Sequence, residues 1–252
     1  MRNLLLALVL AGALATPAAA SSTTTIPQFD ADIAAARSTS GPGGTQILRS
    51  EIRTAVIRLL TDDGVVDAAE RAYLAGRLAD PAWGAGVTSG ARKYAVDFAE
   101  LNDGGPVAPL SVSDPQIQIA DQIGATGALT SSAWVQEGFI PNGAGVTNQI
   151  TLQTAYRDAF NADASSFDPI NVRELIDALS RNTLRGTPSA DEIDGAVALI
   201  SQISRNSNRL YLASWISGHR GGGPGDTGGL VVAAISTDRR FVRLFEIHSW
   251  AE

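Results

Sequence analysis

The chain contains no cysteine, one lysine and two histidines among its 252 residues. Without cysteine the protein has no disulfide, no thiolate nucleophile and no thiol to carry a lipid anchor. A tetrahedral zinc site would have to use both histidines together with carboxylates. Aspartate and glutamate are plentiful, so an all-oxygen calcium site is the metal chemistry that the composition leaves open.

Long apolar runs are also lacking, apart from one at the N-terminus. Arg2 precedes an uninterrupted apolar run from Leu4 to Ala15, and Ala18 and Ala20 are small residues at the spacing of a signal-peptidase site. The run is too short for a bilayer core, which takes about 20 residues. We therefore expect residues 1–20 to be a cleaved signal peptide, which predicts a secreted or periplasmic protein without a stable membrane anchor after cleavage.

Positive charge is scarce, since 19 basic residues stand against 26 acidic ones and the net charge is −7. A nucleic-acid-binding protein usually presents a basic patch, and the sequence has none. Attraction to an anionic membrane surface is disfavoured for the same reason. The charge balance therefore excludes nucleic acid as a partner and leaves a protein or a small molecule.

Composition divides the chain after the predicted signal peptide into four stretches. Residues 21–44 are rich in Ser, Thr, Ala and Gly and predict a flexible lead-in. Residues 45–103 predict a helical region, because apolar residues recur at steps of three and four. Residues 104–148 are rich in Gly, Pro and Ser and predict an irregular connection, and residues 149–252 predict an α+β region.

The C-terminal stretch changes from helical to strand periodicity. Val, Ile, Leu and aromatic residues dominate Arg209–Ile216, Leu230–Ser236 and Arg240–Trp250, which turn residues separate. These segments predict a three-stranded antiparallel β-meander, covered on one face by the preceding helices. The expected fold class is α+β, with N-terminal antiparallel helices followed by helices packed on this C-terminal meander.

An acidic turn from Thr61 to Glu70 resembles the second half of an EF-hand calcium loop. With Gly64 at the sixth place of such a loop, Asp63, Asp67 and Glu70 fall at ligand places, while the first place falls on an apolar residue. The turn also resembles the acidic helix connections of the TerB-like tellurite-resistance family. A capping box, in which Asp67 caps the next helix and Glu70 completes the motif, explains the same residues without metal.

A glycine-rich loop joins the first two predicted strands and contains His219, Arg220 and Asp226. In an antiparallel meander this loop lies at the same end of the sheet as His248, which the third strand carries. Two histidines, a carboxylate and an arginine at one edge, with Trp215 nearby, form a candidate ligand-binding or acid–base site. A solvated surface loop is the alternative interpretation.

The residues therefore favour an exported, non-catalytic binding or interaction protein, because no recognisable catalytic set accompanies the predicted signal peptide. One alternative is a secreted hydrolase that uses His219, Asp226 and His248. Another is a weak calcium-binding module at Asp63, Asp67 and Glu70. No cofactor other than calcium is indicated.

Overall fold

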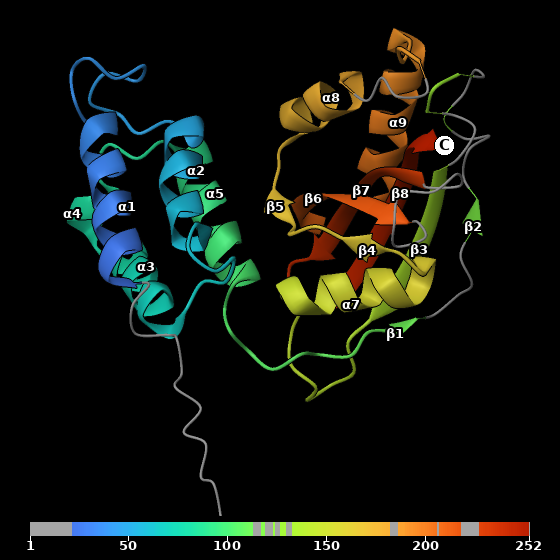
Figure 1. The fold of residues 1–252 in the computed structure, drawn as a ribbon, viewed down its shortest axis with the longest axis horizontal. Coiled ribbons are helices and arrows are strands. Elements are labelled where there is room, and N and C mark those ends of the chain that lie inside the picture. Colours follow the sequence, from blue (N-terminus) through green and yellow to red (C-terminus); the bar gives the residue numbers. More distant parts are fainter. Residues whose placement is uncertain are drawn as a thin grey trace, which may run out of the picture.

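A computed structural model describes residues 22–112, 117–118, 123, 127–129, 133–181, 186–205, 207–217 and 227–251. The predicted signal peptide lies outside these ranges, as do His219, Arg220 and Asp226. Among the described helices, none combines the length and the apolar character needed to cross a bilayer. Helices form the N-terminal part, and a sheet with further helices, among them α7, α8 and α9, forms the C-terminal part (Figure 1).

The N-terminal part is helical, as the sequence predicts. Its elements are α1 (Ser22–Ala36), α2 (Arg49–Ile57), η2 (Arg58–Leu60), α3 (Ala68–Ala79), α4 (Pro81–Gly84) and α5 (Ser89–Leu101). The expected flexible lead-in is wrong, because α1 covers most of it and buries Phe29 and Ile33 against the other helices. These helices have a hydrophobic core of their own, which includes Trp83 and Tyr94.

The predicted C-terminal meander is confirmed. Strands β6 (Ser207–Ser217), β7 (Thr227–Ser236) and β8 (Phe241–Ala251) pair in order and antiparallel. Five shorter strands extend the sheet on both sides: β1 (Ser111–Val112), β2 (Ile117–Gln118), β3 (Ala133–Phe139), β4 (Asp163–Ala164) and β5 (Asp168–Pro169). Strand β3 pairs with β8 along its whole length, so part of the expected irregular connection belongs to the sheet.

Helices cover both faces of the sheet, which corrects the expectation of one covered face. Helix α7 (Gln149–Phe160) packs on one face, and α8 (Val172–Ser180) and α9 (Ala190–Ile203) pack on the other (Figure 1). The sequence of strand β7 explains why both faces of the sheet are covered. Val231 and Ala233 belong to the core beneath α7, while Val232 and Ala234 belong to the core beneath α8 and α9. A strand buried on both faces carries a continuous apolar run instead of alternation.

Candidate functional site

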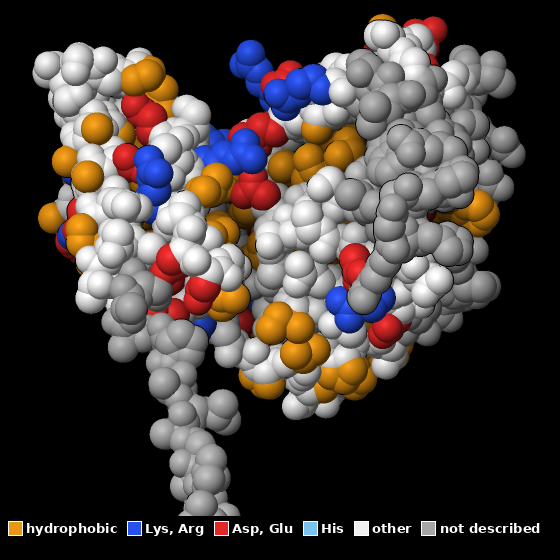
Figure 2. Space-filling view, viewed as in Figure 1, with side chains coloured by type: hydrophobic (Ala, Val, Ile, Leu, Met, Phe, Trp, Pro, Cys, Tyr) orange, Lys and Arg blue, Asp and Glu red, His pale blue; other side chains and the backbone are white. Residues whose placement is uncertain are grey.

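A polar cleft lies between the helical part and the sheet part. Its volume is about 350 Å³, which lies near the lower end of the range for small-molecule binding sites. Arg53 of α2 lines one side and the polar face of α8 the other, while Leu212 to Ser214 of β6 and Leu230 of β7 form the floor. Figure 2 shows this face hollowed between the two parts, with basic and acidic side chains gathered around the hollow.

Asp168 of β5 joins the sheet part to the helical wall of this cleft. Its Oδ1 accepts a hydrogen bond from the Tyr94 hydroxyl of α5, and Arg53 Nη2 lies 2.6 Å from its Oδ2. The Arg53 contact is an ion pair without hydrogen-bond geometry, so Oδ2 accepts no hydrogen bond from the described residues. Burial, and then the neighbouring Asp168 carboxylate, raise the pKa of Tyr94 far above its usual value. Tyr94 is therefore a neutral donor at every physiological pH.

A second ionic contact joins α2 to α8 at the rim of the cleft. Arg49 donates from Nε and Nη2 to the two carboxylate oxygens of Glu174, at 2.9 and 2.8 Å. The same guanidinium lies 4.7 Å from the centre of the Tyr94 ring. Burial alone would raise the pKa of Glu174, but the hydrogen bonds from Arg49 and from the Asn171 amide outweigh it and lower that pKa. Glu174 therefore stays ionised and fixes α8 relative to α2.

The remaining polar groups of the cleft face solvent. Asp177 and Arg181 are exposed at positions i and i+4 of the α8 segment, and neither side chain forms an ion pair with any described residue. Ser165 and Ser214 contribute hydroxyl groups, whose oxygens lie 3.2 Å apart. The cleft therefore presents the Asp177 carboxylate, the Arg181 guanidinium and two serine hydroxyl groups, none of which forms an ion pair with a described residue.

The predicted histidine edge is described only in part. His219, Arg220 and Asp226 lie outside the described residues. The ring of His248 packs edge-on against Trp215, with 4.7 Å between ring centres, so the structure brings these two predicted neighbours together.

Two residues that the sequence interpretation missed complete the surroundings of His248. Its Nε2 is hydrogen-bonded to Glu246, which is 4% exposed, and the other oxygen of Glu246 accepts a bond of 2.7 Å from the Tyr156 hydroxyl. Burial and the Glu246 carboxylate raise the pKa of Tyr156 strongly. Strand alternation could have identified Glu246, because residues 246 and 248 of one strand point to the same face. No local pattern indicates Tyr156, which reaches the sheet from α7.

The acidic turn is organised as a helix cap. Asp67 accepts from the Glu70 amide, and Glu70 accepts from the Asp67 amide, each at 2.8 Å. The second oxygen of Glu70 accepts from the Thr25 hydroxyl of α1, and Asp63 accepts from the Val65 amide at 2.8 Å. Within the described ranges, no three His, Asp or Glu side chains gather as metal ligands. The calcium hypothesis for Asp63, Asp67 and Glu70 therefore gains no support, because local donors engage each carboxylate.

Comparison of the chain with protein-family models, with curated proteins and with solved structures finds no match.

Proposed function

We propose that the chain is an exported binding protein that holds a small polar ligand in the cleft between its helical part and its sheet. One observation carries this proposal: around one open volume of about 350 Å³ the cleft places serine hydroxyls together with the Asp177 carboxylate and the Arg181 guanidinium, which form no ion pair with the described residues. Its walls belong to segments far apart in the chain, and their ionic contacts hold them in place. The apolar run and small residues within residues 1–20 support the export half of the proposal.

The chemistry of the lining selects the class of ligand. Arg181 suits a carboxylate or phosphate group, and Asp177 suits an ammonium or hydroxyl group. A zwitterionic molecule, such as an amino acid or a short peptide, satisfies both groups at once. A purely apolar ligand would leave both charges without a partner and gains nothing from the site.

Isothermal titration of the chain without residues 1–20 tests the proposal, with panels of amino acids, dipeptides and neutral sugars. We expect saturable binding from the zwitterionic panels, weakened about tenfold or more by Asp177→Asn. Asp158→Asn on the exposed side of α7 is the matched control and should bind like the original chain. Binding that Asp177→Asn leaves unchanged, or binding of the sugars alone, would contradict the zwitterion assignment. The absence of binding from all panels would contradict the proposed function.

The contacts of His248 favour a hydrolase as the second candidate function. Glu246 orients the imidazole, as a carboxylate orients a general base, and the ring is partly exposed. If this candidate is right, the chain hydrolyses a chromogenic ester, and His248→Gln lowers the rate about 100-fold or more. Equal rates for the two proteins would remove the candidate.

A further inference from the structure

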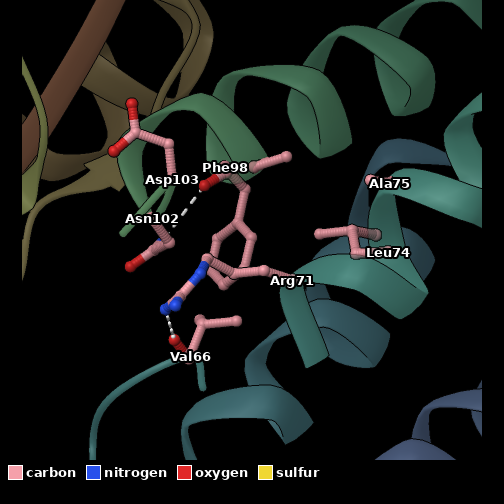
Figure 3. Close-up of a pocket in the computed structure, with 8 residues that line it drawn as sticks. Val66, Arg71, Leu74, Ala75, Phe98, Asn102 and Asp103 are labelled. Carbon is pink, nitrogen blue, oxygen red and sulfur yellow. Dashed lines mark hydrogen bonds between the residues drawn. The ribbon is translucent and has the colours of Figure 1, made fainter. Parts of the chain in front are cut away.

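A second hollow, which we name the Arg71 groove, lies where the Gly64–Val66 turn, Arg71 of α3 and the first turn of α7 meet. It consists of two adjoining cavities of about 210 and 190 Å³ that share Val66, Arg71 and Asn102. Phe98 and Leu74 line the first cavity (Figure 3). The groove is separate from the polar cleft, with which it shares Ser166 alone among the described lining residues.

Two exposed aliphatic side chains line the second cavity, beside the amides Gln149 and Gln153. Val65 is 60% exposed and Ile150 is 52% exposed, and both line this cavity. They are two of the most exposed large aliphatic side chains in the described part of the chain. Apolar surface placed on a concave site gains free energy when a ligand covers it.

Arg71 is held in the groove without a counter-ion. Its Nη1 donates to the Val66 carbonyl oxygen at 2.5 Å, and Figure 3 shows the guanidinium reaching toward that oxygen. Gly104, at φ +68°, lets the guanidinium lie against the backbone, because a side chain there would overlap it. No described carboxylate forms an ion pair with Arg71.

The charge of the groove contrasts with that of the chain. Among the residues that the structure describes, no Asp or Glu lines the second cavity, although the whole chain has 26 of them. Asp103, the one acid among the described residues that line the first cavity, is engaged by Arg239 at 2.6 Å and by the Gly105 amide at 2.9 Å. The groove therefore combines apolar side chains and neutral polar side chains with one arginine that no described carboxylate pairs.

From this arrangement we propose that the Arg71 groove binds a small organic carboxylate with an apolar body. The carboxylate takes the free Nε and Nη2 donors of Arg71, and the body covers Val65, Val66 and Ile150. The first-turn amides of α7 add the positive end of a helix dipole on the same side. A guanidinium that apolar neighbours partly shield from water binds a carboxylate more strongly than a fully hydrated guanidinium does.

Titration with hexanoate, hexanamide and acetate tests this proposal on the chain without residues 1–20. We expect hexanoate to bind at least about tenfold more tightly than either comparison compound, because hexanamide lacks the negative charge and acetate lacks the apolar body. Equal affinity for hexanamide would show that the charge contributes nothing and would overturn the proposal. Undetectable binding of hexanoate at millimolar concentration would overturn it as well.

Two variants locate the binding. Arg71→Gln should lower hexanoate affinity at least about tenfold, whereas Arg92→Gln, on the exposed face of α5, should leave it unchanged. Ile150→Asp changes an exposed position, so it tests the groove even if Arg71→Gln does not fold, and it should weaken hexanoate through charge repulsion. Hexanoate binding that survives Arg71→Gln in a folded protein, or survives Ile150→Asp, contradicts the proposal. Neither variant touches Asp177, so this outcome is independent of the polar cleft.

Discussion

Replacing Asp168 by alanine is the sharpest test of how the helical part is held on the sheet. The variant leaves the hydroxyl of the fully buried Tyr94 without its acceptor, which costs about 1–3 kcal/mol. It also removes the partner of Arg53, whose side chain is 48% exposed, and this contributes at most about 1 kcal/mol. We therefore expect the free energy of unfolding to fall by about 1–4 kcal/mol.

Asp163→Ala is the matched control for this change. Asp163 also lies in a two-residue edge strand paired with β6 and forms an ion pair with Arg157, but the two side chains are 73% and 59% exposed. Such a pair contributes about 0–1 kcal/mol, so this variant should unfold close to the original chain.

Urea unfolding followed by circular dichroism and tryptophan fluorescence measures both variants. A loss of cooperativity in Asp168→Ala, seen as transitions that differ between the two probes, would mean that the two parts have begun to unfold separately. Equal stability of Asp168→Ala and Asp163→Ala would refute the reasoning. It would show that removing the acceptor of the buried Tyr94 hydroxyl costs no more free energy than removing an exposed ion pair.

Two further predictions concern stability. Burial raises the pKa of the three tyrosines Tyr94, Tyr156 and Tyr211, so their contribution is fully present below pH 10 and is lost as the pH rises above it. Stability should fall by about 1.4 kcal/mol per tyrosine for each further pH unit. Tyr73 is only partly buried, so an absorbance increase at 295 nm larger than that of one tyrosine, before the circular dichroism changes, would contradict this prediction. Gly195→Ala should destabilise, because its Cβ would overlap the Ile123 carbonyl oxygen, while Gly76→Ala, on open helix surface, should stabilise by about 0.5–1 kcal/mol in thermal unfolding. Equal shifts for the two variants would argue against the close approach of α9 to Ile123.

The sequence predicted those elements that residues close together in the chain determine. The β6–β8 meander follows from three apolar segments with short turn signals, and the cap at Asp67 follows from the Glu70 that lies three residues later. Strand β3 was missed because its partner β8 lies about a hundred residues away, and its Gly138 and polar neighbours resemble a loop until β8 is beside it. Asp168–Pro169 has the pattern of a helix start, yet the residue that caps α8 is Asn171. Asp168 instead lies in strand β5 and accepts a hydrogen bond from the Tyr94 hydroxyl.

Neither candidate site could be found from the sequence, for a physical reason. The polar cleft takes Arg53 from α2, Asp177 from α8 and Ser214 from β6, and no spacing rule connects them. The Arg71 groove depends on which arginine lacks a carboxylate after folding, and that is a property of tertiary packing. The one candidate built from a local pattern, the acidic turn, is explained by helix capping.

The polar character of the contact between the two parts has a consequence for binding. Apart from Leu101, which packs with the sheet core, the joining contacts described above are ion pairs and hydrogen bonds. Each part has its own core, so weakening the contact need not unfold either part. A ligand that touches both α2 and α8 adds its binding free energy to this contact. Ligand binding in the cleft should therefore strengthen the docking of the two parts more than it strengthens either core.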